Sequence, residues 1–346
     1  MMQSLKDLVR PNIWALEPYS CARDEFKGRD AHVFLDANES PYNNPRNRYP
    51  DPLQVEVKKR LSKIKGIPVE NIFLGNGSDE AIDLVYRVFC RPGVDNVVAM
   101  DPTYGMYRVC ADINDVEYRA VPLLPGYQLN ADAILATSDN NTKVIWICSP
   151  NNPTGNDMDR KAIQRLLTEF CGIIVIDEAY SDFSDLIPMR QYLGHFPNMI
   201  VLNTFSKAWA SASIRLGMAF ASEDIINLFN KVKYPYNINQ LTQNAAMEIL
   251  QDMERTGRWI NMIRTERNAM LPNLQELPIV KQVYPTSANF VLVRVNDANA
   301  IYHYLVDKGI IVRNRNRVTL CDNCLRITIG TKEENSELLG ALRSFH

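Results

Sequence analysis

Short runs of apolar, mostly β-branched residues alternate with amphipathic segments through the middle of this chain. Four such runs lie at residues 97–100, 144–148, 173–176 and 200–205. None alternates strictly between polar and apolar residues, which is typical of strands buried on both faces of a parallel sheet. Residues 160–170, between two of the runs, place apolar side chains at helical spacing. The order strand, helix, strand predicts a doubly wound α/β domain with right-handed crossovers.

Two further parts flank this domain in the sequence. Residues 240–269 form a long helical segment, and beyond it residues 290–295 and 324–328 are predicted strands with a helix at 298–308 between them. The first forty-odd residues carry several prolines towards their end and indicate an arm. We therefore expect an N-terminal arm at 1–45 that packs with the small domain, a large domain at 46–245, and a linking helix with a small α+β domain at 246–346.

Composition excludes several classes of protein. The 38 Lys and Arg residues against 40 Asp and Glu residues leave a formal charge of −2, which gives no basic footprint for nucleic acid or an anionic membrane. No apolar run approaches the roughly 18 residues of a membrane span. We therefore expect a globular, cytoplasmic protein that acts on small molecules, without a nucleic-acid or membrane partner.

The seven cysteines predict a reducing compartment and no metal centre. Their number is odd, and several lie inside apolar runs, where cysteine behaves as a small buried hydrophobe. Cys321 and Cys324 form a single C-x-x-C, whereas a zinc ribbon needs a second pair. The intervening Asp322 and Asn323 favour a turn over a metal or redox site.

The residues that follow the predicted strands are the candidates for chemistry, because ligands of open α/β sheets bind beyond the carboxyl ends of the strands. After residues 72–74 comes Gly-Asn-Gly-Ser-Asp-Glu at 75–80, which opens a predicted helix. Its glycines let the backbone approach a ligand, and the free N–H groups of Ser78 and Asp79 favour an anion. Taken alone, this segment is equally typical of an ordinary capped helix.

Four more strand ends add polar and aromatic groups. These are Tyr104 after 97–100, Asn152 within the Ser-Pro-Asn-Asn-Pro-Thr-Gly at 149–155, Asp177 and Tyr180 after 173–176, and Ser206, Lys207 and Arg215 after the strand of 200–205. A carboxylate that follows four aliphatic residues, as Asp177 does, is costly to bury unless a cation faces it. Each group alone has an ordinary structural explanation, and a lone lysine is usually solvated. Together they fit a flat, cationic, phosphate-bearing heteroaromatic ring attached to Lys207.

These residues resemble those of a known family. The chain is similar to the fold-type I pyridoxal-5′-phosphate (PLP) aminotransferases, and within them to the histidinol-phosphate aminotransferase family. The matching segments are 35–41, 48–52, 75–80, 149–155, 177–180, 205–208, 215–217 and 326–330. One departure is Ser40, where the family usually carries Asn. The implied fold is a large domain with a mostly parallel mixed sheet flanked by helices, a smaller α+β domain and an N-terminal arm.

The resemblance implies a role for each residue around PLP. Lys207 would form the Schiff base and move protons during the reaction, Asp177 would pair with the pyridine nitrogen, and Tyr180 would complete the catalytic set. The remaining implied cofactor contacts are the backbone N–H groups of Ser78 and Asp79, Ser206 and Arg215 at the phosphate, Tyr104 on the ring face, Asn152 and Tyr180 at the ring oxygen, and Tyr49 at the phosphate of the neighbouring subunit. The resemblance therefore also implies a homodimer.

Arginines define the substrate end of the implied site. Arg326 matches the position that binds the α-carboxylate of the amino donor, and Arg313 matches a second anion-binding position. Tyr19 would close the pocket over that anion. Arg315 and Arg317 lie on the same stretch, and a solvated hairpin is the ordinary explanation for them.

The implied reaction is a ping-pong transamination in histidine biosynthesis. It interconverts L-histidinol phosphate and 2-oxoglutarate with imidazole acetol phosphate and L-glutamate. A threonine-phosphate decarboxylase or a broad aromatic aminotransferase uses the same scaffold, and the motifs barely separate these alternatives. An alternative of another class is a PLP-binding transcription regulator, which needs an additional DNA-binding domain. The thirty-odd residues before Leu35 are too few for one.

Overall fold

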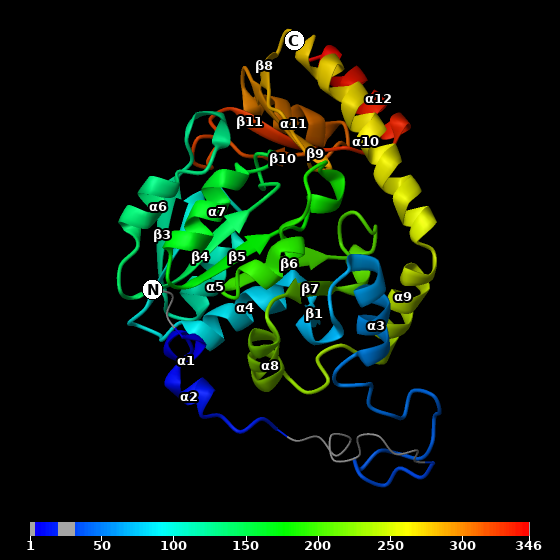
Figure 1. Ribbon diagram of the computed structural model, residues 1–346. Helices are drawn as coiled ribbons and strands as arrows, with labels where there is room; N and C mark the ends of the chain where they lie inside the picture. Colours follow the sequence, from blue (N-terminus) through cyan, green and yellow to red (C-terminus); the bar gives the residue numbers. More distant parts are fainter. Residues whose placement is uncertain (1–3, 20–31, 346) are drawn as a thin grey trace.

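The computed structural model describes residues 4–19 and 32–345 (Figure 1). Its helices are α1 (Leu5–Leu8), α2 (Pro11–Trp14), α3 (Val55–Lys65), α4 (Gly77–Phe89), α5 (Met106–Ile113), α6 (Ala131–Thr137), α7 (Arg160–Glu169), α8 (Glu223–Val232), α9 (Gln240–Gln251), α10 (Met253–Gln275), α11 (Ala298–Asp307) and α12 (Lys332–Arg343). Its strands are β1 (Ile72–Asn76), β2 (Asn96–Asp101), β3 (Glu117–Pro122), β4 (Thr142–Cys148), β5 (Ile173–Asp177), β6 (Met199–Thr204), β7 (Leu216–Phe220), β8 (Val280–Val283), β9 (Phe290–Val295), β10 (Arg313–Asn314) and β11 (Cys324–Thr328).

The larger sheet has seven strands in the order β1-β7-β6-β5-β4-β2-β3, and β7 runs antiparallel to both of its neighbours. Along the chain, the strands are added from β1 towards the β3 edge of the sheet, and β4, β5 and β6 are then added in the opposite direction. With right-handed crossovers, this reversal places α4 and α5 on one face and α6 and α7 on the other. The contacts of α4 with α5 and of α6 with α7 agree with that arrangement. The switch point, where ligands bind in such sheets, therefore lies between β2 and β4.

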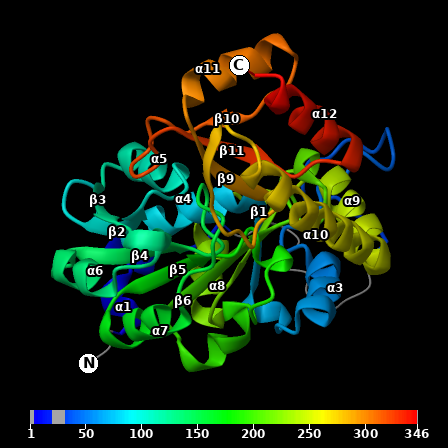
Figure 2. The same ribbon diagram turned by 90° about the horizontal axis from the view of Figure 1, so that it is seen from above.

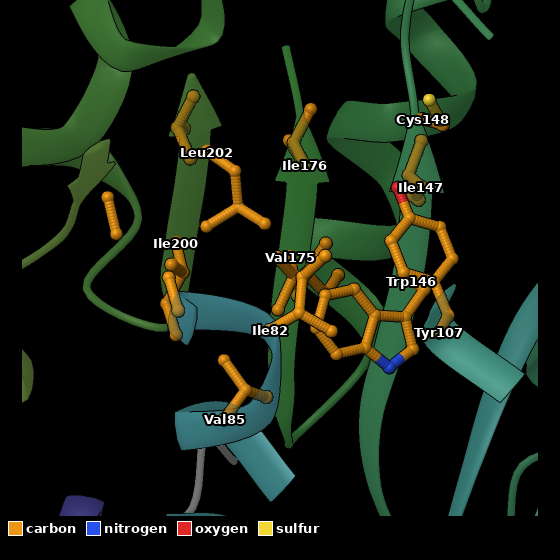
Figure 3. Close-up of a cluster of buried hydrophobic side chains, with 14 of the residues drawn as sticks. Ile82, Val85, Tyr107, Trp146, Ile147, Cys148, Val175, Ile176, Ile200 and Leu202 are labelled. Atoms are coloured by element: carbon orange, nitrogen blue, oxygen red, sulfur yellow. The ribbon is translucent and has the colours of Figure 1, made fainter. Parts of the chain in front are cut away.

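The interior of the large domain is packed between this sheet and its helices. Strands β5 and β6 are buried at every position, as expected for strands covered on both faces. Ile82 and Val85 of α4 lie over these strands (Figure 3). Beside them the rings of Tyr107 and Trp146 stack with centroids 4.7 Å apart. Burial of each such side chain stabilises the fold by about 1.5–3 kcal/mol, so the strand ends above this layer are held rigidly.

The smaller sheet is antiparallel, with strand order β10-β11-β9-β8. It packs with α10, α11 and α12 around a separate apolar cluster, and Figure 1 shows this unit at the top of the molecule. Helix α10 runs from α9 beside the large domain up to α12 (Figures 1 and 2). The predicted single helix at 240–269 is in fact two helices. Asp252 leaves helical geometry between them, and its side chain accepts a hydrogen bond from the Arg255 backbone N at 2.9 Å.

The strands predicted at 97–100, 144–148 and 173–176 are confirmed within β2, β4 and β5, and the one predicted at 200–205 is confirmed by β6, which ends one residue earlier. The apolar patterns did not predict β3 and β7. Strand β3 lies at the edge of the sheet, and most of its residues are exposed or half-buried, so it lacks the apolar run of its neighbours. Strand β7 follows Arg215 directly and is only five residues long.

The first described segment of the chain lies on the large domain. Leu8, Val9 and Ile13 belong to the core of that domain, and the Arg10 backbone N donates to the Val88 carbonyl at 2.9 Å. Helix α2 contacts α8. Residues 32–50, by contrast, run as an irregular segment away from the two sheets (Figure 1). The described helices of the predicted arm therefore contact the large domain in this single chain.

Cys321 and Cys324 are buried, and the Cys324 backbone N donates to the Cys321 carbonyl at 3.0 Å, which forms the predicted turn. Within residues 4–19 and 32–345, no group of three or more His, Cys, Asp or Glu side chains is placed to hold a metal ion. No helix in those ranges combines the length and apolarity needed to cross a membrane.

Candidate active site

A cavity of about 770 Å³ lies where the ends of the large-sheet strands face the small sheet. Eleven of the thirteen residues predicted from the sequence line it: Ser78, Asp79, Tyr104, Asn152, Asp177, Tyr180, Ser206, Lys207, Arg215, Arg313 and Arg326. They come from loops and strand ends far apart in the sequence, which the parallel topology brings to one edge. Two of the arginines belong to the small sheet, so both domains contribute to the site.

Asp177 ends β5 at the floor of the cavity and is 2% exposed. Its Oδ2 accepts a hydrogen bond from the Tyr107 hydroxyl at 2.7 Å, and its Oδ1 accepts one from the Ala179 backbone N at 3.0 Å. Burial raises the pKa of this carboxyl, although both hydrogen bonds act in the opposite direction. In the described part of the chain, Asp177 forms no ion pair. A buried carboxylate in this setting favours a cationic ligand group above it.

Lys207 follows β6 and Ser206, and its Nζ lies 5.7 Å from the centre of the Tyr180 ring. Desolvation by the cavity walls lowers the pKa of Lys207, and the positive charge of Arg326 lowers it further, while Asp177 raises it. A lysine with a lowered pKa carries more neutral, nucleophilic amine at a given pH. The position therefore suits a covalent bond from Nζ to an aldehyde.

The start of α4 and the end of the loop before β7 form an anion cradle, defined here by Gly77, Ser78, Asp79, Ser206 and Arg215. The first-turn N–H groups of a helix have no partner within the helix, and its positive dipole end favours negative charge. The Arg215 guanidinium lies over this helix start, 3.5 Å from the Asp79 carboxylate and 3.5 Å from the Ser206 hydroxyl. Asp79 also accepts a hydrogen bond from the Tyr104 hydroxyl at 3.1 Å.

Glycines permit the close packing of this cradle. A Cβ on Gly217 would lie 2.1 Å from the Ser78 backbone N, and one on Gly77 would lie 2.7 Å from Arg215 Nη2. Gly77 also has a φ of +69°, a left-handed conformation that glycine adopts without strain. The two glycines thus bring the backbone of β7 and the guanidinium against the helix start.

The small sheet presents arginines to the opposite side of the cavity. Arg313 and Arg326 are directly paired across β10 and β11, so their side chains leave the same face of the sheet. Arg326 Nη1 donates to the Asn152 Oδ1, and its guanidinium carbon lies 5.2 Å from the centre of the Phe290 ring. Burial, and then the charges of Arg315 and Arg313, lower the pKa of Arg326.

Sequence analysis did not assign Tyr107 or Arg315 to the site. Tyr107 is fully buried as the second residue of α5 rather than at a strand end, and its hydroxyl donates to Asp177. Arg315 lines the cavity, so the expectation of a solvated hairpin is wrong for this residue, whereas Arg317 is exposed. Its position two residues after Arg313 agrees with this placement, because residues two apart on a strand share a face. The exposed Arg317 follows the same spacing, so the spacing alone does not identify Arg315.

Tyr19 and Tyr49 do not line the cavity in this chain. Tyr19 is 75% exposed at the end of the first described segment. Tyr49 stacks on Tyr236 with ring centroids 4.5 Å apart, and its backbone N donates to Glu39 at 2.7 Å. Their roles in the site stay predictions that depend on a second subunit.

Glu178, next to Asp177, is buried and does not line the cavity. It accepts a hydrogen bond from the Met189 backbone N at 2.6 Å and lies 3.6 Å from Arg190. Burial nevertheless raises the pKa of Glu178 from 4.5 to about 7.

This raised pKa predicts a pH dependence of stability. Between pH 4.5 and 7 the unfolded chain loses the Glu178 proton while the folded chain keeps it, so stability falls as the pH rises through this window. The loss amounts to on the order of 3 kcal/mol. We expect Glu178→Gln to remove this slope in urea unfolding of the cofactor-free protein. Parallel pH profiles of variant and wild type would contradict the assignment.

The comparisons with known proteins agree with this geometry. The family model for aminotransferases of class I and II matches residues 25–342. A solved histidinol-phosphate aminotransferase from Sinorhizobium meliloti, in complex with pyridoxal-5′-phosphate, superposes with a TM-score of 0.79 at 22% identity over 96% of each chain. This likeness supports the fold. The fold and the site define a PLP-dependent aminotransferase of class I and II.

Relatives of higher sequence identity show which family within this class the chain belongs to. A histidinol-phosphate aminotransferase of Bacteroides fragilis is 59% identical over 344 residues, covering 99% of this chain and 100% of that protein. The one from Bacteroides thetaiotaomicron is 56% identical over 344 residues, covering 99% of each. This chain belongs to the histidinol-phosphate aminotransferase family.

The residues of the cavity fit PLP. The buried Asp177 forms no ion pair within the described residues and suits a protonated ring nitrogen. The cradle at the start of α4, which a Cβ on Gly77 or Gly217 would fill, suits a phosphate. Lys207 offers the amine between them.

Proposed function

We propose that this aminotransferase interconverts L-histidinol phosphate and 2-oxoglutarate with imidazole acetol phosphate and L-glutamate. The observation that carries the proposal is the position of Lys207, in one cavity between the buried Asp177 and arginines from the other sheet. The relatives that carry this activity in their names match nearly the whole chain. Because one cavity is lined by both Lys207 and these arginines, we expect both amino donors to bind there in turn, in a ping-pong order.

The chain's own residues would perform distinct tasks. When bound, PLP supplies an aldehyde that reacts with amines and a cationic ring that withdraws electrons. Asp177 would hold the proton on the ring nitrogen, and Tyr107 would fix the orientation of this carboxylate. Lys207 Nζ, when neutral, would remove the proton at the substrate Cα. Tyr104 would lie on the ring face, and Asn152 and Tyr180 would donate to the ring oxygen. Ser78, Asp79, Ser206 and Arg215 would hold the phosphate.

We also propose a homodimer in which Tyr49 of each subunit completes the other's cofactor site and Tyr19 closes the substrate pocket. Exposed apolar side chains on the irregular segment support it: Leu35 is 92% exposed and Tyr42 is 79% exposed in the single chain. Large apolar side chains left this exposed in a single chain favour contact with a second subunit. We further propose that the chain divides into an arm, a large domain and a small domain, with boundaries after residues 45 and 245. The six free cysteines in the described residues fit a reducing compartment such as the cytoplasm.

The activity is tested with purified, PLP-loaded protein. Given L-glutamate and imidazole acetol phosphate, the protein should release 2-oxoglutarate and histidinol phosphate in equal amounts. Release of carbon dioxide from threonine phosphate, without formation of a keto acid, would favour the decarboxylase instead. Faster transamination of phenylalanine than of histidinol phosphate would favour a broad aromatic aminotransferase.

Arg326 should matter for both amino donors, because each carries an anion that a guanidinium can bind. Hydrogen bonds to charged groups contribute about 1.5–3 kcal/mol, so we expect Arg326→Gln to raise both KM values by roughly 10–100-fold. Steady-state kinetics with glutamate and with histidinol phosphate measure this effect. The exposed Arg317→Gln is the matched control and should leave both values within about twofold. Unchanged KM values in Arg326→Gln would remove this residue from the substrate site.

A further inference from the structure

The anion-binding face of the small sheet carries three arginines rather than two. Arg315 follows β10, and its backbone N donates to the Cys324 carbonyl at 2.8 Å, which continues the pairing of β10 with β11 by one residue. Two residues beyond Arg313, it therefore shares the face on which Arg313 and Arg326 lie. All three arginines line the cavity.

The three guanidinium groups lack counter-ions. In residues 4–19 and 32–345, none of them forms an ion pair with an Asp or Glu side chain. The Nε atoms of Arg315 and Arg326 are also buried without a hydrogen-bond partner there. Like charges opposite one another on a sheet repel, and buried donors without partners are costly. This face is therefore organised for an anion that the protein itself does not supply.

We propose that Arg315 makes this face selective for a phosphate dianion over a carboxylate. The inference rests on the proposed function and names the group of the substrate that the third arginine recognises. A dianion gains about twice the Coulomb energy of a monoanion from each guanidinium at a given distance. A phosphate ester also offers three acceptor oxygens, one more than a carboxylate, and can accept donors from three directions.

The position of Arg315 separates this role from that of Arg326. Arg326 donates a hydrogen bond to Asn152 and packs over Phe290. At this position it can bind either a carboxylate or a phosphate. Arg315 is half-buried and is held through its backbone rather than through a bonded side chain. Burial and the charge of Arg313 lower the pKa of Arg315, which agrees with a guanidinium turned into the cavity.

The test compares two simple anions as competitive inhibitors of the PLP-loaded enzyme, with glutamate as the varied amino donor. Methyl phosphate and acetate each carry one anionic group. Each inhibitor therefore reports on a single anion-binding position, whereas glutamate, with two carboxylates, would report on two. We expect Arg315→Gln to weaken inhibition by methyl phosphate by about 10-fold or more and inhibition by acetate by less than about threefold. Arg317→Gln, exposed on the same turn, should change neither.

The pH dependence gives a second readout. The dianion of a phosphate ester takes up one proton near pH 6 and becomes a monoanion. In the wild type, inhibition by methyl phosphate should therefore weaken steeply as the pH falls below about 6, and in Arg315→Gln this dependence should be shallower. Arg315→Lys keeps the charge without the planar fork, so it should retain part of the preference. It also serves as the test variant if Arg315→Gln does not fold.

Each outcome decides the question. Equal weakening of both inhibitors, or no change in either, would overturn the proposal, and so would a selective loss in Arg317→Gln. Because glutamate is the donor, the inhibition assay does not depend on turnover of histidinol phosphate. A wild type that discriminates between the two anions but fails to transaminate histidinol phosphate would refute the proposed function and leave the Arg315 selectivity standing.

Discussion

Replacing Lys207 with alanine is expected to abolish turnover and the covalent attachment of PLP together. General acid–base catalysis by a positioned side chain contributes roughly 10²–10⁴-fold, and the lost covalent bond adds to that, so kcat should fall by at least about 10³-fold. Measurements of transamination and of the cofactor's visible absorption band will show both losses. The fold should persist, because in the described structure Lys207 Nζ forms no ion pair.

Lys207→Arg is the matched variant for this experiment. Arginine keeps the positive charge and most of the length, but it cannot be deprotonated in a protein. If the amine is what the site needs, Lys207→Arg should be as inactive as Lys207→Ala. Addition of a small primary amine such as methylamine should restore part of the activity to Lys207→Ala alone. An active Lys207→Arg, or a retained covalent band in Lys207→Ala, would transfer the role to another residue.

Asp177→Asn should lower kcat severely while the protein still holds PLP through the anion cradle. Asparagine retains the acceptor oxygen but loses the charge opposite the ring nitrogen. Removal of one electrostatic contact to a developing charge typically costs 10²–10³-fold, and we expect a loss of about this size. Half-reaction kinetics with glutamate and a cofactor-binding titration measure the two properties separately. Unchanged turnover would contradict the pairing of Asp177 with a ring cation.

Although Asp177→Asn should lower kcat, it should raise the free energy of unfolding of the cofactor-free protein. Burial raises the pKa of Asp177. Above the ordinary pKa of an aspartate, the unfolded chain gives up this proton before the folded chain does, so the wild type loses stability as the pH rises. We expect cofactor-free Asp177→Asn to unfold at a higher urea concentration than the wild type at pH 7. At pH 4 this difference should be smaller. A variant that is less stable at pH 7 would contradict this sign.

Much of the site could be predicted because parallel strands end at the same edge of a sheet. Tyr104, Asn152, Asp177 and Lys207 each follow a strand that the sequence marks by a short apolar run. That these residues come together follows from one rule, because the carboxyl ends of parallel strands lie at the same edge of the sheet. Their roles, by contrast, follow from the family resemblance, because the sequence pattern gives positions and not chemical tasks.

The residues that could not be predicted depend on tertiary contacts without a local pattern. The sequence around Tyr107 is that of an ordinary buried aromatic residue. In the structure its ring stacks on Trp146 and its hydroxyl donates to Asp177. Arg315 was expected in solvent because β10 has only two residues, too few for a visible alternation. The edge strand β3 escaped prediction because Glu117 and Arg119 interrupt its apolar character.

The central claim is a covalent bond between the Lys207 side chain and the cofactor's aldehyde. Borohydride reduction of the PLP-loaded protein, followed by digestion and peptide mass spectrometry, tests this claim most directly. We expect the reduced cofactor on the peptide that contains Lys207, and pretreatment with excess glutamate should remove most of this label. Labelling of a different lysine, or of none, would contradict it.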